Sequence, residues 1–160
     1  MVVIKNDSVD LGFQHARTVL VVENERNFYQ YPQMLKFASE ALGKRLELTD
    51  CDVVLGGGNR ITRGAILDWL KGYEDVFCAF DYDAGGLQMF STVAASLGDK
   101  ATFVQPRDWQ PWLGRFRKLP DSTERFTRSI SLAEGHGFLA LAEAFRATGK
   151  FMEQEMILDE

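Results

Sequence analysis

The sequence contains few of the residues that build disulfide scaffolds or thiolate and imidazole metal sites. Its 160 residues include only two cysteines, Cys51 and Cys78, and two histidines, His15 and His136. None of them belongs to a Cys-x-x-Cys or Cys/His cluster. This spacing argues against a zinc site and predicts buried, reduced thiols in a cytoplasmic protein.

Long apolar runs are also missing. No stretch approaches the roughly 20 residues that a membrane-spanning helix needs. The opening MVVIKNDSVDLGF has no basic flank followed by a long apolar core, so we expect no signal peptide. With 46% hydrophobic and 26% charged residues, the composition is that of an ordinary globular protein with a sizeable core.

The chain lacks the excess of basic residues typical of a self-sufficient nucleic-acid-binding protein. Its formal net charge is -5, whereas affinity for phosphates comes mainly from Lys and Arg. The segment from Arg107 to Arg128 is an exception, with six basic residues against three acidic ones. A nucleic-acid partner would therefore require this local patch or a separate basic domain.

Four short apolar runs predict strands at residues 19–22, 51–55, 76–80 and 101–105. Helical patterns separate these runs, and Asn59 is expected to cap the middle helix. The unbroken hydrophobicity of VFCAF is typical of a strand that is buried on both faces. The alternation predicts an α/β fold with a doubly wound, mainly parallel four-stranded sheet flanked by helices.

This pattern divides the chain into three predicted parts. Residues 1–17 form a leader or linker remnant, and residues 18–106 form the core. Residues 107–160 form a helical C-terminal extension packed on the core, with one helix around 138–145 and a short helix in the closing KFMEQEMIL. Trp109 and Trp112 are expected to pack under this extension, although stacking on unpaired bases is the alternative.

Acidic residues directly follow two of the predicted strands. Glu23 follows the first, and Asp81 and Asp83 follow the third within FDYDAGG. Because ligands of open α/β sheets bind at the carboxyl ends of the strands, we expect these acids to meet at one edge. Converging carboxylates favour binding of a hard cation, Mg²⁺ or else Mn²⁺. The alternatives are that Asp81 and Asp83 are turn or helix-cap residues and that Glu23 is a solvated strand end.

A glycine-rich loop, Gly56-Gly57-Gly58-Asn59, follows the second predicted strand. Glycines allow the backbone to approach a phosphate, and Arg60 and Arg63 could hold a phosphodiester beside it. The loop is neither a P-loop nor a Gly-x-Gly-x-x-Gly motif, so a dinucleotide site is not indicated. A tight turn without a ligand is the alternative.

The order of the motifs VLVVEN, VVLGGGN and FDYDAGG resembles the Toprim domain of topoisomerases, bacterial primases and several nucleases. The resemblance covers residues 18–105. It is nearest to the branch containing the topoisomerase VI A subunit, the related meiotic break-forming protein and the Wadjet defence nuclease subunit JetD. The closing MEQE also resembles the end of JetD-like proteins, which adds Glu153 and Glu155 as further acidic candidates.

The resemblance implies a Toprim-like nuclease that cleaves DNA phosphodiesters with Mg²⁺, in plasmid or phage defence. Glu23, Asp81 and Asp83 match the metal-binding and catalytic acids, with Glu23 also a candidate general acid or base. The implied partners are DNA, a separate DNA-binding domain or SMC-like defence complex, and a second copy of the chain. The candidate phosphate-binding residues are Gly57, Gly58, Asn59, Arg60, Arg63, Arg115 and Arg117.

Three other functions stay open at this point. The first is topoisomerase-like transesterification, which would need a nucleophile among Tyr29, Tyr31, Tyr73 and Tyr82 or from another chain. The second is a Mg²⁺-binding phospho-acceptor receiver. Receivers generally have a Lys at the end of a late strand, and the fourth predicted strand has none, which counts against this function. The third is a regulatory module without turnover.

Overall fold

A computed structural model describes residues 3–5, 8–10 and 15–159 of the chain. Its centre is a four-stranded, all-parallel sheet in the order β4-β3-β5-β6. The strands are β3 (Thr18–Val22), β4 (Cys51–Leu55), β5 (Asp75–Ala79) and β6 (Ala101–Phe103). The prediction of an α/β fold with a parallel sheet flanked by helices is therefore confirmed.

The central strands β3 and β5 are apolar because both faces of the sheet are covered. Residues 19–22 of β3 and 76–79 of β5 are all buried. Side chains of a strand alternate between the two faces. Val19 and Val21 pack with Leu70 on one face, and Leu20 packs with Met34 on the other.

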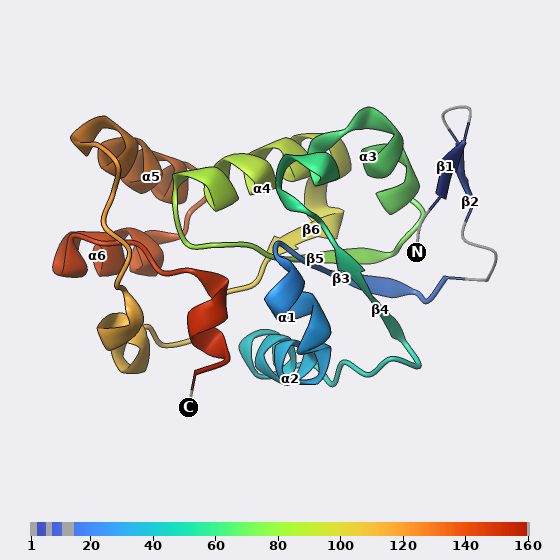
Figure 1. The fold of residues 1–160 in the computed structure, drawn as a ribbon, viewed down its shortest axis with the longest axis horizontal. Coiled ribbons are helices and arrows are strands. Elements are labelled where there is room, and N and C mark those ends of the chain that lie inside the picture. The colour runs from blue at the N-terminus through green and yellow to red at the C-terminus, as the bar shows by residue number, and fades with distance from the viewer. Residues whose placement is uncertain (1–2, 6–7, 11–14, 160) are drawn as a thin grey trace.

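Helices cover the two faces of the sheet in pairs (Figure 1). On one face lie α1 (Glu25–Tyr29) and α2 (Tyr31–Leu42), which ends at Gly43 with a left-handed φ of 64°. On the other lie α3 (Gly64–Leu70) and α4 (Ala84–Leu97). Single turns of 3-10 helix, η1 (Gly58–Thr62) and η2 (Gly98–Lys100), precede α3 and β6.

The C-terminal part of the chain lies beyond the end of the sheet at which β3 and β5 finish (Figure 1). It consists of η3 (Gln110–Arg115), α5 (Thr123–Gly135), α6 (Leu139–Thr148) and η4 (Gln154–Ile157). The sequence did not predict α5, whose exposed face is rich in polar residues. The side chain of Ser122 fixes its start by accepting a hydrogen bond from the Arg125 N–H over 3.1 Å.

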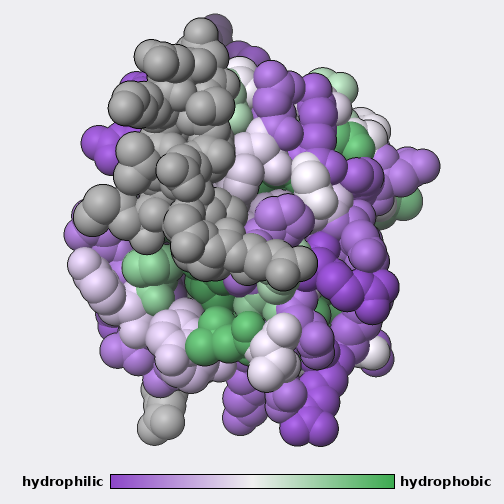
Figure 2. Space-filling model, turned by 90° about the vertical axis from the view of Figure 1, so that its right-hand side faces the viewer, coloured by the Kyte–Doolittle hydropathy of each residue, from purple (hydrophilic) through white to green (hydrophobic). Residues whose placement is uncertain are grey.

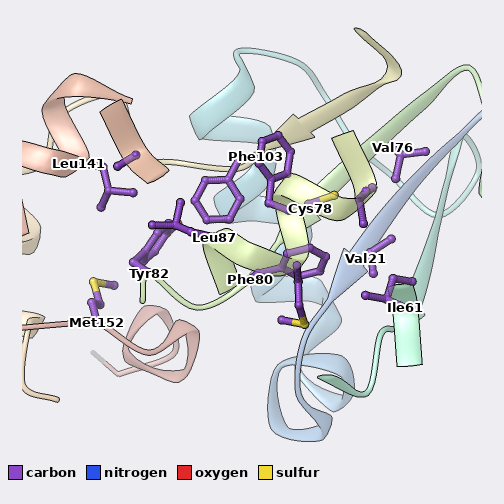
Figure 3. Close-up of a cluster of buried hydrophobic side chains, with 14 of the residues drawn as sticks. Val21, Ile61, Val76, Cys78, Phe80, Tyr82, Leu87, Phe103, Leu141 and Met152 are labelled. Carbon is purple, nitrogen blue, oxygen red and sulfur yellow. The ribbon is translucent and has the colours of Figure 1, made fainter. Parts of the chain in front are cut away.

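The closing segment contains the predicted short helix only as η4, because the residues before it pair as a strand instead. Met152 and Tyr82 exchange backbone hydrogen bonds of 2.9 and 3.2 Å, as antiparallel strands do. Lys118 and Phe151 form a second such pair. Tyr82 and Met152 are fully buried and lie beside Leu141 of α6 (Figure 3), so one apolar core continues from the sheet into the C-terminal part.

The predicted leader contains two short strands. β1 (Val3–Lys5) and β2 (Ser8–Asp10) pair antiparallel and are separate from the main sheet, while residues 1–2, 6–7 and 11–14 lie outside the described part. Figure 2 views the molecule from this end, where hydrophilic side chains surround a small apolar area beside the grey residues. None of the described helices has the length and apolar character that crossing a membrane requires.

Candidate functional site

The predicted acids lie at the point where the order of the strands in the sheet reverses. From β3 the chain passes to β4 on one side and then crosses to β5 on the other. Val22 at the end of β3 is paired with Ala79 at the end of β5, so Glu23 and Asp81 leave neighbouring strands at one edge. Such switch points are where open α/β sheets bind their ligands.

A direct hydrogen bond joins two of these acids. The backbone N–H of Asp81 donates to Oε2 of Glu23 over 2.7 Å. Asp83 is close enough for its charge to act on Glu23 as well. We call Glu23, Asp81 and Asp83 the carboxylate cluster.

Gly86 explains how the chain can turn so tightly at this place. A Cβ atom on Gly86 would lie far inside van der Waals distance of the carbonyl group of Asp81. The absence of a side chain therefore allows the first turn of α4 to press against the segment that carries the two aspartates.

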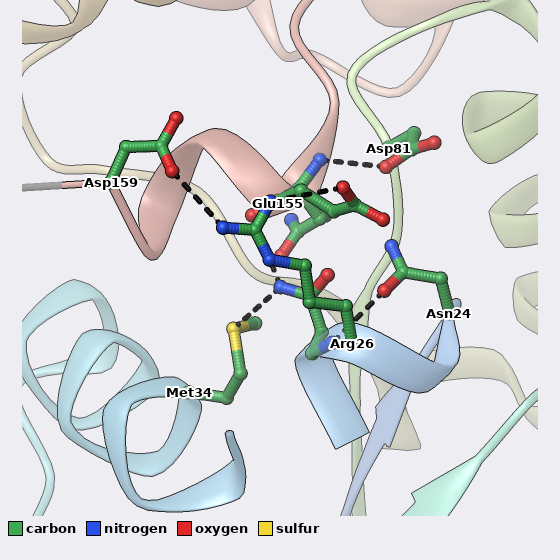
Figure 4. A network of polar contacts seen from close by, with 8 residues as sticks. Asn24, Arg26, Met34, Asp81, Glu155 and Asp159 are labelled. Carbon is green, nitrogen blue, oxygen red and sulfur yellow. Dashed lines mark hydrogen bonds and ion pairs between the residues drawn. The ribbon is translucent and has the colours of Figure 1, made fainter. Parts of the chain in front are cut away.

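Asp81 is held from the C-terminal segment, residues 150–159. The backbone N–H of Gln154 donates to Oδ1 of Asp81 over 2.7 Å, the dashed line that reaches Asp81 in Figure 4. The side-chain amide of Gln154 donates to the carbonyl oxygen of Phe80 over 2.9 Å. Gln154 is fully buried, and its own carbonyl oxygen accepts from Nδ2 of buried Asn27 over 3.1 Å. The C-terminal segment, itself anchored on α1, thus fixes this carboxylate.

Asp83 has a different set of partners. Its Oδ1 accepts from the Gly86 N–H over 2.9 Å, which makes Asp83 the N-cap of α4. Its Oδ2 accepts from Nζ of Lys118, also over 2.9 Å, and the same ammonium lies 3.4 Å from Glu153. The helix-cap alternative is therefore correct for Asp83, and both of its oxygens are engaged.

The electrostatics of the site favour protonation of Glu23 and Asp81. Burial, followed by the charge of Asp81, raises the pKa of Glu23 to about 8. Burial, with a contribution from Asp83, raises the pKa of Asp81 to about 6, although the Gln154 hydrogen bond opposes this. Burial alone would lower the pKa of Lys118, but its hydrogen bond and the charges of Asp83 and Glu153 raise it above its ordinary value.

The cluster offers the ligands of a hard cation, but it is not arranged as a closed metal cage. Among the residues that the structure describes, no group of three or more His, Cys, Asp or Glu side chains is arranged to hold an ion. Glu23 and Asp81 each use one oxygen in the hydrogen bonds above. Mg²⁺ commonly binds through one or two carboxylates and keeps several waters, so the donor chemistry of this pair fits it.

The glycine loop does not lead into a helix N-terminus as expected. Gly57 and Gly58 have φ angles of 61° and 64° and open into η1, whereas α3 begins only at Gly64. Asn59 is not a helix cap; its carbonyl oxygen accepts from the Thr62 hydroxyl over 2.8 Å. Arg60 and Arg63 are exposed, so a phosphate contact there would depend on their side chains.

The remaining predicted residues divide into structural and exposed ones. Arg115 donates to the Met156 carbonyl oxygen and stacks over Trp112, so it holds the C-terminal segment. Arg117 is exposed. Glu155 pairs with Arg26 over 3.3 Å, whereas Glu153 faces Lys118.

Trp109 and Trp112, which were expected to pack under the C-terminal extension, have packing partners in the fold. Trp109 is buried against Tyr82 and Phe116. Trp112 packs edge-on against Phe37. Both side chains take part in packing, Trp109 fully and Trp112 while half-buried.

Sequence reasoning missed Lys118 and Gln154 as residues of this site. In the structure Phe116 is buried and Arg117 is exposed, so Lys118 turns inward with Phe116, but the sequence Phe-Arg-Lys carries no pattern that indicates this. No local signal indicated Gln154, because its contacts are with segments far away in the chain.

Comparison of this chain with protein-family models, with curated protein sequences and with solved structures found no match.

Proposed function

We propose that this protein cleaves DNA phosphodiester bonds with Mg²⁺ at the carboxylate cluster, in the manner of the Toprim nucleases whose motifs its sequence resembles. The observation that carries the proposal is the Glu23–Asp81 pair at the switch point of the sheet, with Asp83 beside it. Two buried acids with raised pKa values are costly unless a cation or a reaction uses them.

Glu23 and Asp81 would hold the ion, and Asp83 would join them. A bound Mg²⁺ supplies Lewis-acid activation of the phosphate and of a water molecule. Glu23 is also suited to move a proton, because its raised pKa lies close to neutral pH. The exposed Arg60, Arg63 and Arg117 are candidates to contact the DNA backbone.

The wider setting follows from the sequence resemblance alone. A role in plasmid or phage defence, a separate DNA-binding domain or SMC-like complex, and a homodimer are parts of this proposal. The net charge of -5 supports a requirement for another basic domain or chain.

Nicking of supercoiled plasmid in the presence of Mg²⁺ or Mn²⁺ tests the proposal directly. We expect nicking by the wild-type protein and its loss in E23Q and D81N, with folding checked by circular dichroism. E25Q and D68N remove exposed carboxylates elsewhere and should keep the activity. Equal nicking by all five proteins, or no metal-dependent nicking of double- or single-stranded DNA, would contradict the proposal.

One observation favours a second candidate function, acceptance of a phosphoryl group on an aspartate. The strand order corresponds to the first four strands of a flavodoxin-like sheet, the order that receiver domains use. Lys118 brings to Asp83 the ammonium group that a receiver needs and that the sequence does not offer at the end of the fourth predicted strand. Mass spectrometry after incubation with Mg²⁺ and acetyl phosphate would detect a phosphorylated Asp81 or Asp83; an unmodified chain would exclude this function.

A further inference from the structure

Lys118 is an ammonium group inserted into a cluster of carboxylates. It comes from the segment after η3, far from β3 and β5 in the chain, and contacts Asp83 over 2.9 Å and Glu153 over 3.4 Å. Its backbone is fixed independently, by two hydrogen bonds with Phe151. The chain therefore delivers a positive charge to the place where the proposed function requires a metal ion.

We propose that Lys118 competes with the divalent cation for Asp83. When the ion binds, Lys118 releases Asp83 and moves onto Glu153. This inference rests on the proposed function, because it assumes that the carboxylate cluster takes up a divalent ion. It adds a regulatory step to that function: the site is closed by its own ammonium until a cation displaces it.

The partners of Asp83 support the first half of the proposal. Oδ1 of Asp83 is held by the Gly86 N–H as the cap of α4, so Oδ2 is the oxygen that can turn to a cation. That oxygen is occupied by Lys118. A metal ion that binds Oδ2 therefore meets the ammonium of Lys118 at the same oxygen, and two cations that close repel each other.

The exposure of the three side chains supports the second half. Asp83 is largely covered, with 12% of its side chain exposed, whereas Glu153 is 47% exposed and Lys118 38%. Lys118 thus lies between an inner and an outer carboxylate. Moving from Asp83 to Glu153 would keep an ion pair and shift the ammonium towards solvent, where exposed pairs cost little to rearrange.

Calorimetric titration of the full chain with Mn²⁺ alone, without DNA, tests the competition. We expect K118Q to bind Mn²⁺ at least about fivefold more tightly than the wild type, because the competitor is gone. K118R keeps the charge and should stay within about twofold of the wild type. K71Q, which removes an exposed lysine paired with Asp68, is the matched control and should also bind as the wild type does.

A double-mutant cycle tests the resting place on Glu153. E153Q should weaken Mn²⁺ binding in the wild-type background, since Lys118 then has no second partner, but should change little in the K118Q background. Equal weakening by E153Q in both backgrounds would overturn the movement onto Glu153. Equal or weaker Mn²⁺ binding by K118Q, relative to the wild type, would overturn the competition itself.

The outcomes separate this inference from the proposed function. Tighter binding by K118Q together with no DNA cleavage by any variant supports the competition and contradicts the nuclease. Cleavage that depends on Mg²⁺ together with unchanged binding by K118Q supports the nuclease and overturns the competition. No Mn²⁺ binding by wild type or K118Q overturns both.

Discussion

The backbone N–H of Asp81 donates a 2.7 Å hydrogen bond to Oε2 of Glu23, joining two residues that stand 58 positions apart in the chain. This contact places a glutamate carboxylate beside an aspartate at the buried edge of a parallel sheet. Burial disfavours both charges, and the charge of Asp81 further disfavours that of Glu23. The pair is thus a source of instability that a bound cation would relieve.

Replacing Glu23 with Gln should stabilise the metal-free protein at pH 8. The pKa of Glu23 in the folded protein, about 8, lies above its ordinary value of 4.5. The contribution of Glu23 to stability is therefore fully present below pH 4.5 and is lost as the pH rises through 8. E23Q removes this loss and can keep the hydrogen bond from Asp81. We expect a gain on the order of 2 kcal/mol at pH 8 and a flatter pH profile, measured by urea unfolding with a chelator present.

The matched control for this prediction is E25Q, which changes the exposed glutamate two positions further on in α1. Its stability should follow the wild-type pH profile. A wild-type protein whose stability rises between pH 5 and 8 would show that Glu23 is not held in an environment that disfavours its charge.

Divalent cations should stabilise the wild type more at pH 8 than at pH 5. Binding requires deprotonated carboxylates, and protons occupy Glu23 and Asp81 at the lower pH because both pKa values are raised. Thermal unfolding with Mg²⁺ or Mn²⁺ at ten times the dissociation constant should give a gain of about 1.4 kcal/mol at pH 8. D81N should abolish this gain, and D68N should retain it; the same stabilisation of D81N would exclude Asp81 as a ligand.

The sheet could be predicted from the sequence because local signals determine it. Apolar β-branched runs gave β3 and β4, and the alternation of strands and helices gave the parallel arrangement. Glu23 and Asp81 could be brought together in advance because the carboxyl ends of parallel strands meet at one edge. These inferences needed only the period and order of the elements.

The partners of the acids could not be predicted, because they come from irregular segments. Lys118 and Gln154 reach the site through single β-bridges, Lys118–Phe151 and Tyr82–Met152, which leave no periodic pattern. The start of α3 was placed too early, since Gly57 and Gly58 adopt left-handed conformations that open a 3-10 turn first. Long-range pairing of short segments depends on tertiary packing rather than on propensity.

Gly86→Ala should destabilise the protein and disturb the site together. The new methyl group would collide with the backbone of Asp81, so either α4 or the aspartate segment must shift. We expect a loss of about 2–4 kcal/mol and weaker Mn²⁺ binding, measured by urea unfolding and calorimetry. G135A at the end of α5 places its methyl group in open space and is the control; equal stability of G86A and G135A would contradict the close approach.

Tyr82→Phe should leave any DNA cleavage intact. The Tyr82 ring is fully buried and its hydroxyl donates to the Val104 carbonyl oxygen over 2.8 Å, while burial raises the pKa of the phenol. It is therefore a core residue and not an accessible nucleophile. Y82F should cost about 1 kcal/mol in urea unfolding and keep the rate of plasmid nicking. Loss of nicking in folded Y82F, with a protein–DNA adduct in the wild type, would favour transesterification instead.

Gln154→Ala should show that the C-terminal segment positions Asp81. The substitution removes the hydrogen bond to the Phe80 carbonyl oxygen and leaves a cavity beside the backbone N–H that holds Oδ1 of Asp81. We expect a cost of about 2–3 kcal/mol in urea unfolding, together with Mn²⁺ binding weakened severalfold. The control is R26Q, which breaks exposed ion pairs of the same segment with Glu155 and Asp159 and should cost at most about 1 kcal/mol. If R26Q weakened Mn²⁺ binding as much as Q154A, general docking of the segment, rather than the buried amide, would position Asp81.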